Sequence, residues 1–269
     1  MSGFFTETHN DYPAPEPETI QSNIPVYSGE VKSVSFSTLT KFEQCKYSVF
    51  LSKVIKIPGV SGPAADRGSE IHEKLEDYVM GKREKFPWTT IKAGQHYAPI
   101  IDSFRKLYKE NRVVPEFQLT FTKDMQPSEW DAPNCWLRGA IDVLVWENDK
   151  RTKASLYDYK TGQDTMSAKH RSQLMLYALL LMILYPELEE VRCAAIYLDI
   201  KKDLFYTSFT RQDIDMLWPR YLDRLQQITN CENYDPNPNG FTCRWCQHAK
   251  PIEELEQTEP ACEYAHVRG

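Results

Sequence analysis

Two short, mostly apolar segments near the middle of the chain carry charged side chains at positions where a core strand has apolar ones. Residues 138–145 read Arg-Gly-Ala-Ile-Asp-Val-Leu-Val, and residues 155–162 read Ser-Leu-Tyr-Asp-Tyr-Lys-Thr-Gly. Side chains alternate between the two faces of a strand, so Asp158 and Lys160 point the same way, and a turn through residues 147–153 brings Asp142 alongside them. The pattern predicts a hairpin that gathers two carboxylates and one lysine.

Helical spacing of apolar positions recurs on both sides of this hairpin. Ser37 is the predicted N-cap of the first helix, and Thr210 with Asp213 resembles a capping box before the last one. The predicted helices cover residues 35–57, 64–80, 97–110, 168–185 and 211–229. Further predicted strands cover residues 116–121, 191–200 and 204–209, with a turn at 201–203 between the last two. This order of elements is typical of an α/β protein.

Composition narrows the class of protein. The chain has 269 residues, of which 41% are hydrophobic, which is enough for one elaborated domain with a buried core. Its longest apolar run, residues 174–185, is shorter than the roughly 20 residues that span a bilayer, so no membrane segment is expected. The first thirty residues contain no Lys or Arg and include four prolines, unlike a secretory signal, and we expect a flexible arm over residues 1–34. Seven cysteines without secretory features favour reduced thiols or metal ligands in a cytoplasmic protein.

The net charge of −6 argues against a nucleic-acid-binding protein, because phosphate contacts normally require a basic surface. Local groups of basic residues offset this argument. They are Lys41, Lys46, Lys53 and Lys56, then Lys82, Arg83 and Lys85, and then Lys201 and Lys202. Each group either flanks a groove or is an ordinary solvated surface, and the sequence leaves both readings open.

The hairpin carboxylates favour a divalent-metal site. Hard oxygen ligands hold Mg²⁺ or Mn²⁺, and a lysine beside them can orient a water molecule or offset developing charge during phosphodiester hydrolysis. Asp142 lies between Ile141 and Val143 and is costly to bury without a metal or a partner. The alternative is a structural ion pair of Asp158 with Lys160 or Arg138.

Five short motifs, in this order, resemble the RecB-like branch of the PD-(D/E)XK nuclease superfamily. They are Gly68-x-x-x-His72, a strand glutamate represented by Glu116, Gly139-x-x-Asp142, Asp158-x-Lys160 and Gln173-x-x-x-Tyr177. Asp-x-Lys alone occurs by chance in many proteins, whereas five elements in the order of the family are a specific signal. An isoleucine rather than a proline precedes Asp142, which fits the RecB-like branch better than restriction enzymes.

The resemblance implies a role for each of these residues. His72, Glu116, Asp142, Asp158 and the carbonyl of Tyr159 are the implied metal ligands. Lys160 would position or activate water, and Gln173 and Tyr177, four residues apart on one helix face, would contact the DNA backbone or brace the site. Because imidazole accommodates Mn²⁺ better than Mg²⁺, we expect Mn²⁺ to support activity at least as well. Taken singly, His72, Tyr177 and Glu116 are as easily explained as structural residues.

Many RecB-like nucleases also hold a [4Fe-4S] cluster with one early cysteine and three late ones, and this chain has a similar layout. The implied ligands are Cys45, Cys243, Cys246 and Cys262. Cys262 lies farther from Cys246 than is usual in the family, so Cys231 and His248 remain alternative ligands, and a zinc site is chemically reasonable. The remaining interpretation is that some or all of these are free thiols, as we expect for Cys135 and Cys193.

Together these observations predict a restriction-endonuclease-like core with a mixed central sheet flanked by helices. We expect a nuclease domain over residues 35–230, with a cysteine-rich segment over 231–269 packed on it. The expected function is a metal-dependent DNA exonuclease in recombination, repair or phage DNA metabolism, with DNA and a recombination or replication protein as partners. The alternatives are an endonuclease using the same site, an inactive nuclease fold used for binding or assembly, and a structural metal protein. The oligomeric state is left open.

Overall fold

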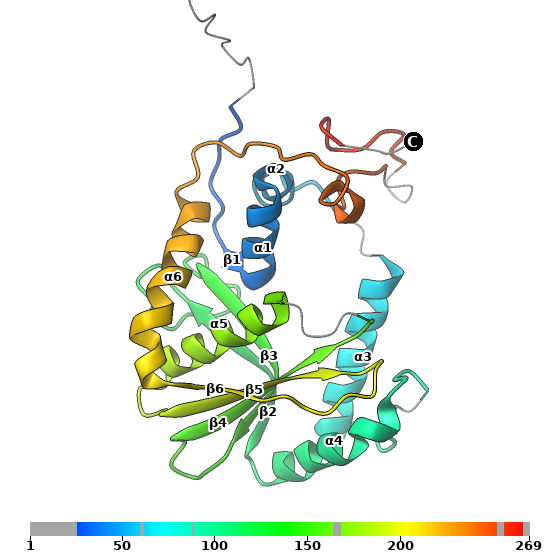
Figure 1. Cartoon of the computed structure of the whole chain (residues 1–269), viewed down its shortest axis with the longest axis vertical. Coiled ribbons are helices and arrows are strands. Elements are labelled where there is room, and N and C mark those ends of the chain that lie inside the picture. The colour runs from blue at the N-terminus through cyan, green and yellow to red at the C-terminus, as the bar shows by residue number, and fades with distance from the viewer. Residues whose placement is uncertain (1–25, 60–61, 88, 164–167, 252–255, 266–269) are drawn as a thin grey trace, which may run out of the picture.

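A computed structural model gives the arrangement of the chain and describes residues 26–59, 62–87, 89–163, 168–251 and 256–265 (Figure 1). Six strands form one mixed sheet, in which β1 with β3 and β4 with β5 are parallel and the other pairs are antiparallel. The strands are β1 Val34–Ser35, β2 Val113–Phe121, β3 Leu137–Trp146, β4 Lys153–Lys160, β5 Glu190–Tyr197 and β6 Thr207–Thr210. The predicted mixed α/β fold is therefore confirmed.

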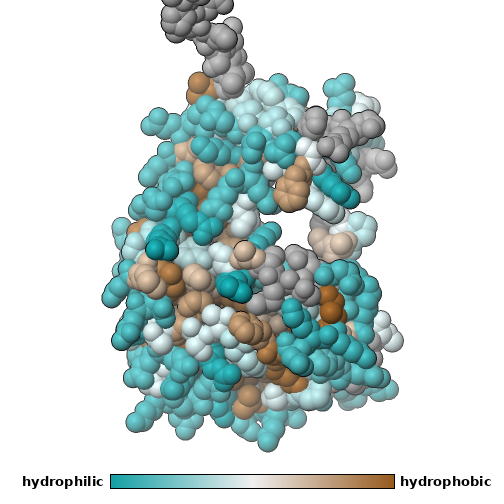
Figure 2. Space-filling model, in the orientation of Figure 1, coloured by the Kyte–Doolittle hydropathy of each residue, from teal (hydrophilic) through white to brown (hydrophobic). Residues whose placement is uncertain are grey.

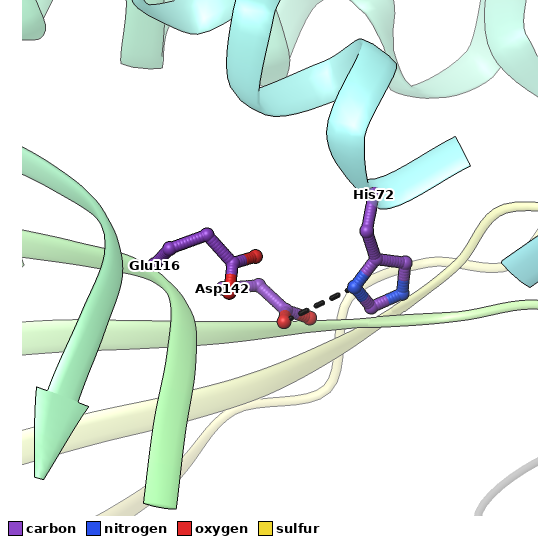
Figure 3. A group of neighbouring side chains, drawn as sticks. All are labelled: His72, Glu116 and Asp142. Carbon is purple, nitrogen blue, oxygen red and sulfur yellow. Dashed lines mark ion pairs between the residues drawn. The ribbon is translucent and has the colours of Figure 1, made fainter. Parts of the chain in front are cut away.

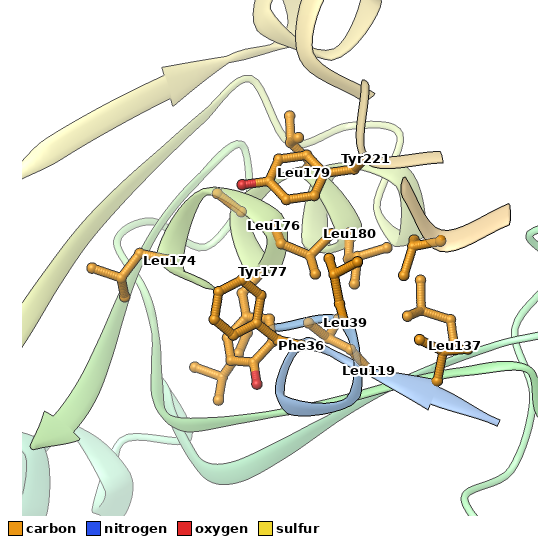
Figure 4. Packing of buried hydrophobic residues seen from close by; sticks show 14 of the residues in the cluster. Phe36, Leu39, Leu119, Leu137, Leu174, Leu176, Tyr177, Leu179, Leu180 and Tyr221 are labelled. Carbon is orange, nitrogen blue, oxygen red and sulfur yellow. The ribbon is translucent and has the colours of Figure 1, made fainter. Parts of the chain in front are cut away.

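Helices cover both faces of the sheet. The α-helices are α1 Phe36–Gln44, α2 Lys46–Val49, α3 Pro63–Val79, α4 Gly94–Lys109, α5 Ala168–Leu184 and α6 Arg211–Thr229, with a π-helix, Phe50–Val54, and a 3₁₀ turn, η2 Cys243–Trp245. One hydrophobic cluster joins the sheet to α1, α5 and α6, and a second joins the opposite face to α3 and α4. Figure 4 shows the first cluster, in which α5 lies among Phe36, Leu137 and Tyr221. The apolar sequence of α5 is explained by this burial on several sides.

The prediction of one continuous helix over residues 35–57 is wrong. The helix breaks at Cys45, whose backbone is extended at φ −160° and ψ 108°. The break frees the carbonyl of Gln44, which accepts a 2.9 Å hydrogen bond from the side chain of Asn237, while the Asn237 backbone N–H donates to Cys45 Sγ at 3.4 Å. The N-cap is Ser35 rather than Ser37, and its hydroxyl accepts from the Thr38 N–H.

The other predicted elements are present with shifted ends. The 191–200 strand ends at Tyr197 and the next strand begins at Thr207, so the connection between them is longer than the predicted turn at 201–203. The hydroxyl of Tyr97 on α4 holds this connection by donating to the carbonyls of Ile200 and Lys202, at 3.0 and 2.9 Å. Buried side chains from another element, rather than a tight turn, therefore shape this connection.

The described part of the expected N-terminal arm is folded. Val31 and Val34 are buried, and β1 pairs with the start of β3. The hydroxyl of Tyr27 donates to Glu263 at 2.6 Å, and its backbone carbonyl accepts from the N–H of Tyr234 at 2.9 Å. Tyr27 therefore contacts the C-terminal segment, and Val31 and Val34 pack in the core, which corrects the expectation of a flexible arm for residues 26–34. Residues 1–25 lie outside the described residues, and the boundaries at 35 and 231 stay a prediction.

Within the described part of the chain, no helix is both long enough and apolar enough to cross a bilayer.

Candidate active site at the fork of the sheet

The sheet divides into a fork beside Asp142. β3 pairs with β4 only from Val143 onward, and the end of β4 continues along β5 alone. At the point of separation, the backbone N–H of Tyr159 donates to Asp142 Oδ2 at 2.5 Å. A side-chain carboxylate therefore takes the place of a backbone acceptor, so that the strands part without leaving this buried N–H unsatisfied. The predicted hairpin is confirmed, and its end is where the candidate residues meet.

In β2 and β3, the alternation of side chains between the two faces of the sheet shifts by one residue at this level. On β3, Leu137 and Ile141 belong to the cluster with α5, whereas Val143 belongs to the cluster with α3 and α4. On β2 the change occurs at Glu116, which lies between the paired positions Pro115 and Phe117 and has a left-handed backbone, φ +47°. This conformation costs a non-glycine residue about 1–3 kcal/mol, a cost typical of functional sites.

Three side chains from three elements converge at the fork. His72 of α3, Glu116 of β2 and Asp142 of β3 each offer a ligand atom, and these atoms lie within 4.8 Å of one another. His72 Nδ1 lies 3.2 Å from Asp142 Oδ1 (Figure 3). Ligands around a cation with metal–oxygen distances of about 2.1 Å lie within about 4.2 Å of one another, so this set fits one divalent cation with little movement. The donor set of two carboxylates and one imidazole also suits such an ion.

The electrostatics of this group favour a bound cation. Burial and then the charge of Asp142 raise the pKa of Glu116 to about 7. Burial also raises the pKa of Asp158, and the charge of Lys160 opposes this shift. Although burial lowers the pKa of His72, the hydrogen bond and charge of Asp142 raise it overall. A cation bound among these carboxylates would offset the burial and mutual repulsion that raise the pKa values of Glu116 and Asp158.

Asp158 lies beside the three-residue group rather than within it. It is buried and forms an ion pair with Lys160 on the same face of β4. The ring of Tyr159 packs edge-on against the His72 ring, with centroids 5.7 Å apart. The roles of Asp158 and of the Tyr159 carbonyl as ligands stay predictions, while Tyr159 orients both Asp142 and His72.

The two predicted polar residues of α5 form a chain of hydrogen bonds with Lys160. Lys160 Nζ donates to Gln173 Oε1 at 3.0 Å, and Gln173 Nε2 donates to the Tyr177 hydroxyl at 3.1 Å. Burial raises the pKa of Tyr177 to about 12, so its hydroxyl keeps its proton. The structure therefore brings Gln173 and Tyr177 to the site as braces of Lys160.

Gly139 makes room for this brace. A Cβ atom at Gly139 would lie 2.8 Å from Cε1 of Tyr177. Gly139→Ala should push the Tyr177 ring away and loosen Gln173 and Lys160, costing about 1–3 kcal/mol of stability as overpacking. We expect a lower Tm in thermal unfolding and, for the DNA hydrolysis that the sequence motifs predict, a lower kcat. Gly81→Ala, at a position without neighbouring atoms but with φ +81°, is the control for backbone strain alone, and equal loss of activity in both variants would contradict this role of Gly139.

Sequence reasoning missed an ion pair between Arg67 of α3 and Asp199, which lies two residues after the end of β5. Asp199 is buried, and its two oxygens accept hydrogen bonds of 2.7 and 2.8 Å from the guanidinium of Arg67. The backbone N–H of Gly162, two residues after Lys160, donates to the same carboxylate at 2.7 Å. The available signal was a lone acidic residue after the apolar run that ends in Leu198.

This pair predicts a pH-dependent contribution to stability. The hydrogen bond from Arg67 lowers the pKa of Asp199, against the opposing effect of burial. The stabilisation is therefore fully present above the ordinary aspartate pKa of about 4 and is lost as the pH falls below it. Asp199→Asn should lower the free energy of unfolding by about 1–3 kcal/mol at pH 7, with the difference shrinking in acid. Urea denaturation of the wild type and the variant, at pH 7 and at a pH below about 4, measures this difference in the free energy of unfolding. A difference that does not change with pH would contradict the stabilising role of the Asp199 carboxylate.

Four cysteines from distant parts of the chain line one cavity of about 530 Å³: Cys45, Cys243, Cys246 and Cys262. Burial and then the neighbouring thiols raise the pKa of Cys262 to about 11. Among the described residues, no three of their sulfurs lie within 4.8 Å of one another. Whether these sulfurs hold an iron–sulfur cluster, a zinc ion or no cofactor stays a prediction.

The alternative ligands are arranged differently. Cys231 donates from its sulfur to the carbonyl of Asn233 at 3.1 Å and does not line this cavity. His248 is fully buried, and its Nε2 lies 3.1 Å from the side-chain nitrogen of Gln247. Cys135 and Cys193 are buried elsewhere in the protein as isolated thiols. Of the candidate ligands, the four predicted cysteines are those that line one cavity together, and their role as ligands stays a prediction.

Sequence comparison identifies the family of the chain. The profile of the PD-(D/E)XK nuclease superfamily matches residues 33–250, which include every candidate residue except Cys262. The chain belongs to the PD-(D/E)XK nuclease superfamily. The residues that resemble the superfamily's motif are Asp142 on β3 and Asp158 and Lys160 on β4, and their assignment as its signature stays a prediction. Nucleases of the superfamily use divalent metals, which agrees with the donor set at this PD-(D/E)XK site.

Solved structures of low sequence identity resemble the PD-(D/E)XK chain over most of its length. SSO0001 is 13% identical, with 89% of this chain and 90% of that one covered and a TM-score of 0.40. A proposed exonuclease from Eubacterium rectale is 14% identical, with 84% and 92% covered and a TM-score of 0.48. The alkaline exonuclease LHK-Exo from Laribacter hongkongensis is 12% identical, with 73% and 89% covered and a TM-score of 0.28. No curated protein matches the sequence.

Proposed function

We propose that the protein is a metal-dependent DNA exonuclease that hydrolyses phosphodiester bonds at the fork. The observation that carries this proposal is the convergence of His72, Glu116 and Asp142 beside a lysine held by α5. These three residues, with Asp158, would hold Mg²⁺ or Mn²⁺, and the imidazole favours Mn²⁺. When bound, the cation lowers the pKa of its water and stabilises charge on the phosphate.

Lys160 is the catalytic residue of this proposal. Asp158 and Gln173 fix its ammonium group from two sides, so it is oriented before substrate arrives. From this position the ammonium group donates to the attacking water or to a phosphoryl oxygen, and stabilises the negative charge that develops in the transition state. Tyr177 contributes by holding Gln173.

The preference for DNA ends rests on the resemblance of Gln173-x-x-x-Tyr177 to the exonuclease side of the RecB-like branch. The test is degradation of end-labelled linear DNA against covalently closed circular DNA, with Mn²⁺, Mg²⁺ or EDTA. Metal-dependent loss of the linear substrate alone would support an exonuclease. Cleavage of circles would change the activity to an endonuclease, and intact DNA in every condition would favour an inactive nuclease fold used for binding or assembly.

The four-cysteine cavity supports a [4Fe-4S] cluster as a second cofactor. Cys45 at the helix break and three cysteines near the C-terminus would then fix the two ends of the domain to each other. Iron and zinc analysis with visible absorption of the purified protein, beside Cys243→Ser, tests this assignment. Four iron atoms per chain, lost in the variant, are expected; one zinc atom per chain would contradict it.

A role in recombination, repair or phage DNA metabolism, a location in the cytoplasm and a recombination or replication protein as partner complete the proposal. They follow from the resemblance to the RecB-like branch and from the reduced-thiol composition.

A further inference from the structure

Two cavities lie next to each other along α1 and share part of their lining. The cavity beside the fork, of about 450 Å³, is lined by Arg138, Lys160, His170 and Trp130, among others. The cysteine cavity is the second, and Ser37 and Lys169 line both. A continuous surface therefore leads from the proposed catalytic lysine to the C-terminal segment. Figure 2 shows the molecule hollowed between α1 with the C-terminal segment on one side and α3 on the other.

The charge along this surface has one sign. Among the described residues, neither cavity is lined by an Asp or a Glu. Lys41 lines the cysteine cavity, and neither Lys41 nor Lys169 forms an ion pair with the part of the chain that the structure describes. Burial and then the charges of Lys41 and Arg138 lower the pKa of Lys53, which places three cations near one another. A surface of this kind suits a polyanion, although the chain is acidic overall.

Two large aromatic side chains stand exposed on the wall of the cysteine cavity. Phe241 is 74% exposed and Trp245 is 76% exposed, and they are the most exposed aromatic residues of the described chain. The guanidinium of Arg244 lies 5.1 Å from the centre of the Trp245 ring. Exposed rings among cations are the arrangement with which proteins stack the bases of single-stranded nucleic acid.

We propose that the fork cavity and the outer rim of the cysteine cavity form a path for a single DNA strand, on which Trp245 and Phe241 stack bases while Lys41 and Lys169 bind phosphates. The interior of the cysteine cavity is left to the four thiols and the proposed cluster. The bases of a duplex are stacked on one another and do not present their faces to such rings, so the path selects unpaired strands. The inference deepens the proposed function, because it names the substrate that reaches Lys160. The reaction rests on that proposed function, whereas strand binding does not.

The test is binding of a fluorescein-labelled 20-nucleotide oligo-dT, followed by anisotropy in buffer without divalent metal so that no hydrolysis occurs. Trp245→Ala and Phe241→Ala should each raise the Kd roughly five- to hundredfold, as expected for the loss of one stacked base. Trp245→Phe should retain most of the affinity. Phe205→Ala removes a ring that is also exposed, at 60%, but lies outside both cavities, and should leave the Kd unchanged.

Charge and strand type provide independent readouts. Lys41→Ala and Lys169→Ala should each reduce the dependence of log Kd on log salt by about 0.7, the value for one phosphate contact on a single strand. A blunt duplex should compete at least tenfold more weakly than the unlabelled single strand. Quenching of tryptophan fluorescence by oligo-dT should fall in Trp245→Phe, which is expected to fold normally.

Wild-type affinity in both aromatic variants, or equal competition by the duplex, would overturn the strand path. These results are separable from the nuclease proposal. A wild-type protein that binds oligo-dT through Trp245 but hydrolyses no DNA with any metal would remove the nuclease activity and leave the path. If the protein hydrolyses DNA but its affinity for oligo-dT does not depend on Trp245 or Phe241, the nuclease proposal stands and the strand path is excluded.

Discussion

Lys160→Ala is expected to reduce DNA hydrolysis by roughly 10²- to 10³-fold, the usual effect of removing one oriented donor to the developing charge. Lys160 Nζ is held by Asp158 and by Gln173 Oε1, so a water molecule in its place would lack both the charge and the fixed position. The loss should appear in kcat rather than in KM, because the interaction is strongest in the transition state. Steady-state hydrolysis of a labelled oligonucleotide with saturating Mn²⁺ measures it.

Lys153→Ala is the matched control for this change. Lys153 is on the same strand, but its exposed side chain pairs with Glu190 at 2.9 Å, far along β4 from the fork, and its loss should leave kcat unchanged. Removing Lys160 leaves Asp158 buried without its partner, so Lys160→Arg is needed as a second variant that keeps the positive charge. A folded Lys160→Arg protein with low kcat separates catalysis from stability. Activity near wild type in Lys160→Ala would exclude Lys160 from the reaction.

The sequence predicted the parts of the fold that local patterns determine. Alternation along residues 153–160 placed Asp158 and Lys160 on one face, and both now lie on the side of Gln173. The apolar run of α5 and the capping residues of α6 likewise fixed those helices, since the Thr210 N–H donates to Asp213 as expected. Such patterns depend on a few neighbouring residues, and for that reason they can be recognised without the fold.

Features that depend on distant contacts could not be predicted in this way. Regular alternation along β3 fails at Asp142, where the strand reverses its faces together with Glu116 on β2. The helix break at Cys45 depends on hydrogen bonds from Asn237, nearly two hundred positions later. Asp199 was missed because its partner, Arg67, lies on another element. In each case the side chain that stabilises the unusual backbone or buried charge is remote in sequence.

In the candidate site, too, the sequence predicted some features and could not predict those that depend on distant contacts. Motif order identified His72, Asp142 and Lys160 as residues of one site, and the structure brings His72 and Asp142 into contact. The motif order did not reveal that the carboxylate of Asp142 also accepts a hydrogen bond from the N–H of Tyr159 at the point where β3 and β4 separate. Asp142 is therefore a hydrogen-bond acceptor for the backbone and, in the proposed site, also a metal ligand.

This double role leads to the second large effect, which is expected for Asp142→Asn. The asparagine oxygen can still accept from the Tyr159 N–H, so the fork is retained, while one of the charges beside Glu116 is removed. Without metal, the variant should unfold close to the wild-type temperature. A cation at about one hundred times its Kd should stabilise the wild type by about 2.7 kcal/mol, or roughly 5–10 °C, and the variant by much less. Hydrolysis should fall by at least about 10²-fold.

Thermal unfolding in EDTA and in a series of Mn²⁺ concentrations separates the two functions of Asp142. Asp102→Asn is the control, because Asp102 is an exposed carboxylate on α4 that accepts from Tyr78 and is not part of the His72–Glu116–Asp142 group. Its response to Mn²⁺ should equal that of the wild type. If Asp142→Asn instead unfolds far below the wild type in EDTA and retains the full shift with Mn²⁺, Asp142 is a structural residue and the cation binds elsewhere. A lost shift with unchanged metal-free stability makes the fork a preformed metal site, in which the backbone and the ligands are positioned before the cation binds.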